Sequence, residues 1–123
     1  MYNNALKAYK SVERVSVSGR ETEARVLTEA ASKLRVCQRK WDNETRRTLL
    51  REALNYNQRI WSIFQTELGK ADNPLPNHIK VDLLRLSGFV DKRIFEVMAS
   101  PSPELLTILI KINENIAAGL RGQ

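Results

Sequence analysis

Cysteine and histidine are almost absent from this chain of 123 residues, which contains one of each, Cys37 and His78. A lone cysteine cannot form an internal disulfide, and zinc sites built on thiolates need several cysteines. His78 closely follows two prolines, a position that favours a solvent-exposed side chain over a catalytic base. The sequence therefore excludes a disulfide framework, and its cysteine usage is typical of a reducing cytoplasm.

The sequence patterns of common enzyme sites are missing as well. No segment alternates apolar and polar residues over the length of a strand, so no glycine-rich phosphate loop follows a strand. Glu21, Glu23 and Glu29 lack the Glu-x-x-His partner that a di-metal helical bundle requires. We therefore expect no enzymatic activity, no cofactor, no bound metal and no small-molecule substrate.

Long apolar runs are absent too. The richest one, LLTILI at residues 105–110, is far shorter than the ~20 residues of a membrane-spanning helix. Residues 2–14 mix polar and apolar side chains and do not form the pattern of a secretion signal. The sequence predicts a cytoplasmic protein that does not enter the membrane.

Apolar residues recur at helical spacing in every long segment, which predicts an all-α fold. We expect a single domain, residues 1–123, built as a bundle of about five helices. The predicted helices are residues 3–12, 19–40, 44–68, a segment around 79–97, and 104–118. Ser18 and Glu21 have the spacing of a capping box at the start of the second. Gly88 lies inside the fourth helix, where it predicts the close approach of a neighbouring helix.

Basic residues concentrate between Lys33 and Arg51, where seven Lys and Arg side chains face two acidic ones. Clustered cations bind phosphates, and a tryptophan among them can stack on a base. The candidate RNA-binding residues are Arg39, Lys40, Trp41, Arg46 and Arg47. Three alternatives stay open: an acidic protein surface as partner, a merely solvated helix face, and a Trp41 that belongs to the core.

Surplus apolar surface indicates a protein interface. The segment LLTILIKI at 105–112 is apolar nearly all round, which favours either a central helix or one shared with a partner. Asn57 and Asn113 interrupt apolar stripes, and a buried amide is costly unless it is hydrogen-bonded. Each asparagine either sets helix register by bonding a neighbouring backbone group, or receives the backbone of a partner.

Four short segments carry a family resemblance: NQRIW at 57–61, NPLP at 73–76, FVD at 89–91 and INENIAAGL at 112–120. In this order and spacing they resemble the flagellar biosynthesis regulator FlaF family of alphaproteobacteria, over essentially the whole chain. The departures are mild, since Ile60 stands where leucine is common and residues 16–24 lack a proline often found there.

The resemblance implies a small helical cytoplasmic protein needed for flagellin production and export. Such proteins are thought to act as flagellin secretion chaperones, paired with a second regulator, FlbT, that controls flagellin mRNA. The resemblance thus makes flagellin the expected partner, with FlbT as a further candidate.

The mechanism we expect is masking, in which a groove covers an amphipathic flagellin segment until export, with tryptophan as an anchor. The expected partner-binding residues are Asn57, Trp61, Phe64, Leu105, Leu109, Asn113 and Ile116. Two alternatives stay open: a regulator that binds flagellin mRNA through residues 33–51, and a scaffold or homodimer without a client.

Overall fold

Four α-helices and one short 3-10 helix make up the computed structural model, which describes the backbone of residues 2–122 and the side chains of residues 20–122. The elements are α1 (Tyr2–Arg39), α2 (Arg46–Leu68), α3 (Asn77–Ala99), η1 (Pro103–Leu105) and α4 (Leu106–Leu120). The described backbone contains no strand, so the predicted all-α bundle is confirmed. Within that part of the chain, no helix combines the length and apolar character needed to cross a bilayer.

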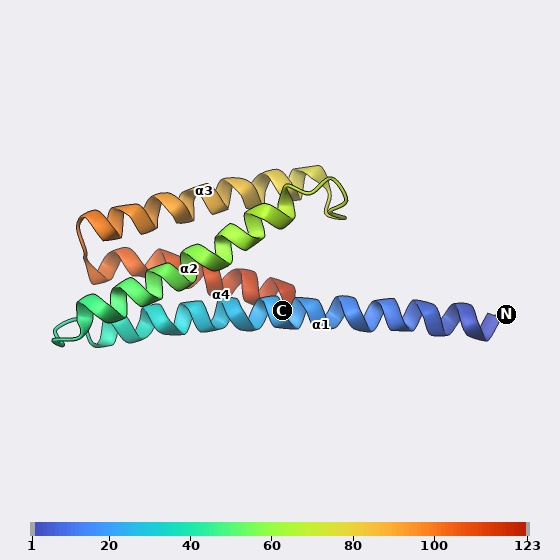
Figure 1. Cartoon of the computed structure of the whole chain (residues 1–123), viewed down its shortest axis with the longest axis horizontal. Helices are drawn as coiled ribbons and strands as arrows, with labels where there is room; N and C mark the ends of the chain where they lie inside the picture. Colours follow the sequence, from blue (N-terminus) through green and yellow to red (C-terminus); the bar gives the residue numbers. More distant parts are fainter. Residues whose placement is uncertain (1, 123) are drawn as a thin grey trace.

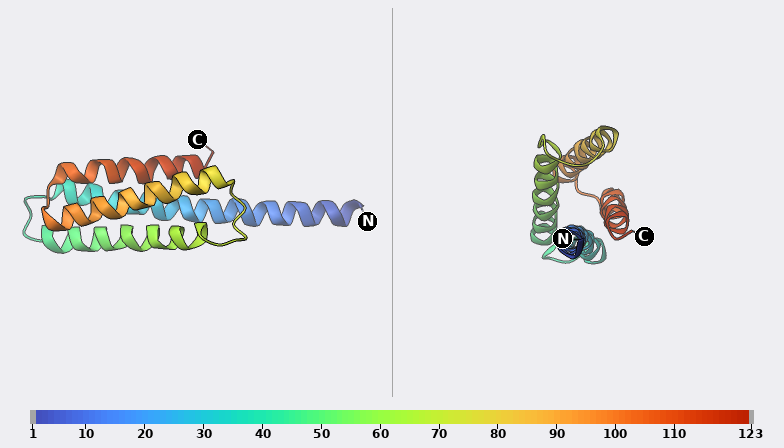
Figure 2. Two further views of the ribbon diagram at one scale, coloured as in Figure 1. Left: turned by 90° about the horizontal axis from the view of Figure 1, so that it is seen from above. Right: turned by 90° about the vertical axis from the view of Figure 1, so that its right-hand side faces the viewer.

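The expected break between the first two predicted helices is wrong, because α1 runs without interruption through residues 13–18. Neither proline nor glycine occurs there, and Gly19, the next residue, costs a helix only ~1 kcal/mol relative to alanine. Helix α1 therefore passes through the predicted capping box at Ser18, whose side chain lies outside the described residues. Its N-terminal half continues beyond the other helices (Figures 1 and 2).

The C-terminal half of α1 is the spine of the bundle, with α2 on one side and α4 on the other. Helix α3 packs mainly on α2 and touches α4 only slightly, as the end-on view in Figure 2 shows. Gln65 joins α2 to α3, since its Nε2 donates to Ser87 Oγ and to Asp91 Oδ2, the latter at 2.9 Å. Because α3 is covered on one side, much of its apolar surface stays exposed.

Small and branched side chains of α1 form the centre of the core. Alanines and leucines alternate on one face of this helix, so the facing helices can approach closely. The buried apolar residues of α1 are Ala24, Leu27, Ala30, Ala31, Leu34 and Cys37. Burial raises the pKa of the Cys37 thiol above its ordinary value, as expected for a small thiol in the core.

Gly88 does not mark a close helix contact, so this expectation is wrong. Apart from the backbone of its own helix and its two chain neighbours, a Cβ placed on Gly88 would meet no atom of the described residues within 4 Å. The glycine lies on the outer face of α3, opposite the buried Val90 and Val97. Phe95, on the same outer face, is 72% exposed. The propensity cost of this glycine is therefore not offset by packing against the part of the chain that the structure describes.

Candidate functional site

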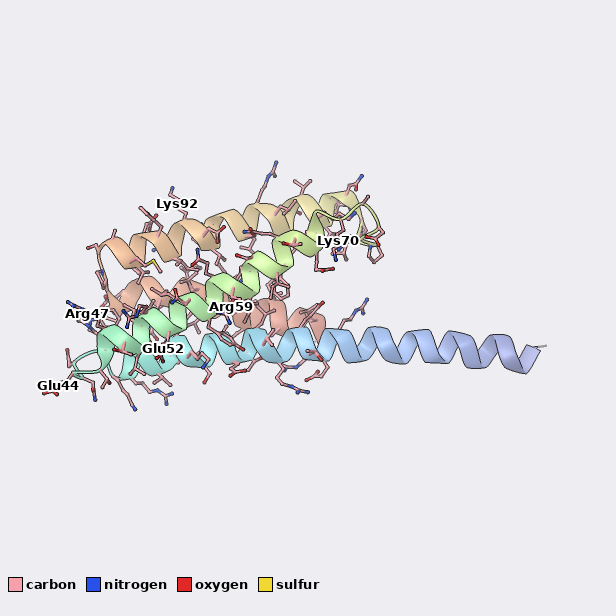
Figure 3. All side chains as sticks on the ribbon, viewed as in Figure 1. Glu44, Arg47, Glu52, Arg59, Lys70 and Lys92 are labelled. Carbon is pink, nitrogen blue, oxygen red and sulfur yellow. The ribbon has the colours of Figure 1, made fainter. Side chains whose placement is uncertain are left out.

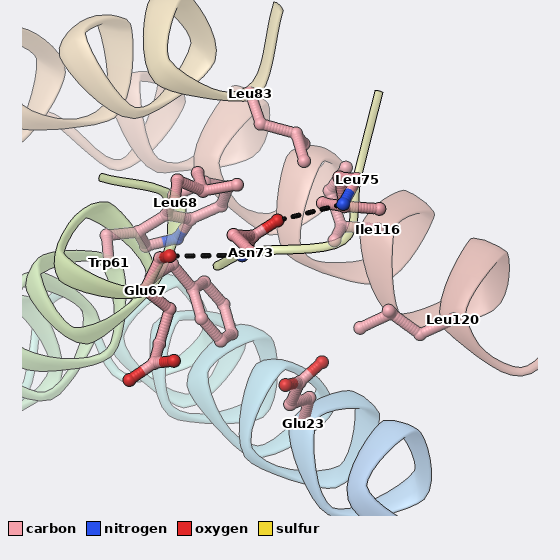
Figure 4. A pocket seen from close by; sticks show the side chains of 10 residues that line it. Glu23, Trp61, Glu67, Leu68, Asn73, Leu75, Leu83, Ile116 and Leu120 are labelled. Atoms are coloured by element: carbon pink, nitrogen blue, oxygen red, sulfur yellow. Dashed lines mark hydrogen bonds between the residues drawn. The ribbon is translucent and has the colours of Figure 1, made fainter. Parts of the chain in front are cut away.

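A cavity of about 130 Å³ opens where α2 ends and α3 begins (Figure 4). All four α-helices and the linker between α2 and α3 contribute to its wall. The lining residues are Glu23, Trp61, Phe64, Glu67, Leu68, Asn73, Leu75, Leu83, Ile116 and Leu120. Most of this surface is aliphatic or aromatic, so the cavity is suited to an apolar side chain.

Trp61 and Phe64 form the aromatic wall of the cavity. Their rings meet edge to face, with centroids 5.7 Å apart and planes at 84°. The Trp61 side chain is buried, and its Nε1 donates a hydrogen bond to Asn113 Oδ1 at 2.9 Å. Phe64 is half-buried and is the more accessible ring. The hydrogen bond thus holds the tryptophan in one orientation, while the phenylalanine packs against the core and stays partly exposed.

Asn57 and Asn113 form a buried hydrogen-bonded pair behind this wall. Asn113 Nδ2 donates to Asn57 Oδ1 at 2.5 Å. Asn57 Nδ2 donates to the backbone oxygens of Ala53, at 2.8 Å, and Ala30, at 3.4 Å. The network therefore joins α1, α2 and α4, and both amides have partners in the core. Of the two interpretations of the sequence, Asn57 therefore agrees with the one in which the amide bonds a neighbouring backbone group.

The structure brings only part of the expected partner-binding set to one place. Trp61, Phe64 and Ile116 line the cavity, whereas Asn57 and Asn113 lie behind it. Leu109 is buried in the core and Leu105 is half-buried in η1, and neither lines the cavity. The expected groove along α4 is therefore shorter than the sequence indicated.

The linker between α2 and α3 closes one side of the cavity, a feature that sequence reasoning missed. Asn73 Nδ2 donates to the Glu67 backbone oxygen at 3.0 Å, and Asn73 Oδ1 accepts the Leu75 N–H at 3.0 Å (Figure 4). Pro74 and Pro76 restrict the backbone on both sides of Leu75. The sequence signal for this feature was an apolar residue between two prolines. Prolines restrict the backbone of the loop, so they can hold the apolar side chain in a fixed place.

Two carboxylates, Glu23 of α1 and Glu67 of α2, stand on the same side of the cavity (Figure 4). Partial burial, and secondly the charge of Glu67, raise the pKa of Glu23, while Arg20 opposes the shift. Glu67 pairs with Lys70 at 2.8 Å, whereas Glu23 has no hydrogen bond or ion pair within the described side chains. We call the cavity with these carboxylates the acid-rimmed groove.

The acid-rimmed groove has two carboxylates and neither histidine nor cysteine among its lining residues. Among the side chains of residues 20–122, no three His, Cys, Asp or Glu groups are placed to hold an ion. The two carboxylates therefore favour an organic cation, such as the side chain of lysine or arginine, at the edge of an apolar ligand.

The basic candidates gather at the turn between α1 and α2. Arg39, Lys40 and Arg47 are exposed there, and the Arg46 guanidinium stacks over the Trp41 ring at 5.0 Å from its centroid. Trp41 is half-buried and packs against the core, as one alternative held. Its ring therefore has one face covered by Arg46, which reduces the surface that a nucleic-acid base could stack on.

The comparisons with known proteins identify the chain at the level of its family. No curated protein and no solved structure matches it. The family model of flagellar protein FlaF matches residues 5–120, which include the cavity-lining residues and the asparagine pair. The chain belongs to the flagellar protein FlaF family, which is involved in flagellum biosynthesis.

Proposed function

We propose that this protein is a secretion chaperone that binds flagellin through the acid-rimmed groove and so promotes flagellin synthesis and export. The observation that carries the proposal is an apolar cavity, open at one end of the bundle, in a member of a flagellar family. An amphipathic flagellin segment placed there would be kept from aggregating before export.

The size of the groove supports one anchoring side chain. Its volume of about 130 Å³ is close to that of an engineered cavity of ~150 Å³ that binds benzene. A leucine, isoleucine or phenylalanine of the client therefore fits. Burying such a side chain stabilises a complex by about 2 kcal/mol. The rest of the affinity would come from contacts on the rim, where Leu75 and Phe64 are partly exposed.

The charge of the rim supports a preference among client segments. A lysine or arginine beside the apolar anchor would lie near Glu23, which has no ion pair in the described part of the chain. A carboxylate at the same position would be repelled by both Glu23 and Glu67. We therefore expect the bound segment to carry a basic residue next to its anchor, within one helical turn.

Calorimetry of the purified protein with monomeric flagellin tests the proposal. We expect binding with a negative heat-capacity change and weak salt dependence, the signature of buried apolar surface. The double variant Leu75→Ser, Leu83→Ala should weaken binding about tenfold. The control Leu84→Ala changes an exposed leucine on the same helix outside the cavity and should bind normally. If the folded double variant bound flagellin with unchanged affinity, flagellin would not bind in the acid-rimmed groove and the proposal would be wrong.

Two further points stay predictions. Flagellin mRNA is the alternative ligand, bound through residues 33–51, and it would give an affinity that falls steeply with salt. The regulator FlbT is an expected additional partner, which co-purification with this protein and flagellin would detect.

A further inference from the structure

A second cavity, of about 540 Å³, lies between the start of α2 and the end of α3. It is lined by Arg46, Arg47, Leu50, Arg51, Leu54, Met98 and Pro101, and we call it the arginine cleft. Arg47 marks its place at the end of the bundle away from the acid-rimmed groove (Figure 3). The two sites share no residue, so a role for the arginine cleft does not depend on flagellin binding.

The lining of the arginine cleft is basic, and two of its arginines, Arg46 and Arg47, also border a neighbouring hollow that contains Asp42 and Glu44. No lining residue is acidic, and none of its three arginines has an ion pair among the described side chains. Arg47 and Arg51 are four residues apart and share one face of α2. Arg46 is held by its stacking on Trp41. Three neighbouring guanidinium groups repel one another and match carboxylates well.

The floor of the arginine cleft is apolar. Leu50 and Leu54 are buried beneath it, while Met98 is 47% exposed. Phe95, one turn earlier in α3, is 72% exposed and extends the apolar surface along the helix. Methionine adapts its shape to different apolar partners. A ligand that satisfies both features must present carboxylates together with apolar side chains.

We propose that the arginine cleft is a docking site for an acidic amphipathic helix of a partner protein. The apolar side of that helix lies on Met98 and the leucine floor, and its flanking Asp and Glu residues pair with Arg47 and Arg51. The apolar floor favours this occupant over nucleic acid, whose phosphates would pair with the arginines but would leave Met98 and the leucines without an apolar partner.

Fluorescence anisotropy with the full chain tests the proposal. The probe is a labelled amphipathic peptide of about 18 residues, ~27 Å of helix, with leucines on one face and glutamates beside them. Two further peptides replace the glutamates by glutamine or by lysine. We expect binding of the acidic peptide, at least about tenfold weaker binding of the glutamine peptide, and no binding of the lysine peptide that Arg47→Glu changes, because a basic amphipathic peptide suits the acid-rimmed groove instead.

Variants of the protein locate the binding. Arg47→Glu should weaken binding of the acidic peptide about tenfold or more, and Met98→Gln should also weaken its binding. Arg47 is in the first turn of α2, where a negative charge favours the helix, so Arg47→Glu should not unfold the protein. The control is Arg59→Glu, which reverses the charge of an exposed arginine of α2 outside the cleft, and its binding should be unchanged.

Several results would overturn the proposal. Equal binding of the acidic and glutamine peptides would show that the arginines do not select the ligand. Binding of a uridine RNA of about 20 nucleotides that is lost in Arg47→Glu but not in Met98→Gln would indicate a nucleic-acid surface. A concentration-dependent size of the protein alone, abolished by Arg47→Glu, would place a second copy in the cleft.

Discussion

Replacing Asn113 by alanine should destabilise the fold strongly, because its amide is the middle of a buried chain of hydrogen bonds. Asn113 accepts from Trp61 Nε1 and donates to Asn57 Oδ1, at 2.9 and 2.5 Å. All three side chains are at most 1% exposed, so water cannot replace the lost partner without entering the core.

The magnitude follows from the groups left without partners. Asn113→Ala leaves the Trp61 N–H and the Asn57 oxygen unsatisfied, and each costs about 1–3 kcal/mol. We therefore expect the free energy of unfolding to fall by about 3–5 kcal/mol, including the small cavity. Asn57→Ala leaves one Asn113 N–H without its partner and should cost less. Both single variants break the bond between Asn113 and Asn57. The double variant should therefore lose ~1–2 kcal/mol less unfolding free energy than the sum of the two single losses.

Urea unfolding followed by circular dichroism measures these free energies, and a Trp41→Phe background lets fluorescence report on Trp61 alone. The emission of Trp61 should also change in folded Asn113→Ala, since the indole loses its acceptor. A loss below about 1 kcal/mol, or additive costs in the double variant, would refute the idea that the network holds α2 against α4.

Three other changes test separate parts of the structure. Gly88→Ala should raise the free energy of unfolding by about 1 kcal/mol in urea, because the site is helical and a Cβ there meets open space; a loss of stability would mean a hidden neighbour. Glu23 has a raised pKa in the folded state, so its contribution to stability is greatest at low pH and falls as pH rises through the folded pKa. Glu23→Gln should therefore raise Tm at neutral pH and leave it nearly unchanged below the ordinary pKa of glutamate, and equal effects at both pH values would argue against this. The buried thiol of Cys37 should react with Ellman's reagent only as fast as the protein opens, with rapid reaction in native buffer as the opposing result.

Much of the helical architecture could be predicted because its signals are local. The third predicted helix, residues 44–68, agrees closely with α2, Arg46–Leu68. Pro74 and Pro76 marked the boundary before α3, since proline is excluded from helix interiors. The weaker signal around Gly19 failed, because one glycine and a serine cannot end a helix whose other residues favour it.

The two asparagines show where local reasoning ends. Their positions in apolar stripes predicted burial, and both are buried. Their bond to each other joins residues 56 positions apart in the chain, and no helical spacing encodes such a pair. The same holds for the carboxylates of the acid-rimmed groove, which come from α1 and α2, and for the arginine cleft, which needs the end of α3 beside the start of α2.

The sequence by itself determined that this protein is an all-α member of a flagellar family without a disulfide framework, because composition and helical periodicity are properties of neighbouring residues. Only the tertiary structure decided which apolar side chains are buried and which charged side chains lack an ion pair among the described residues. Burial depends on how helices distant in sequence pack, and here α3 covers one side of the bundle and leaves a cavity at each end.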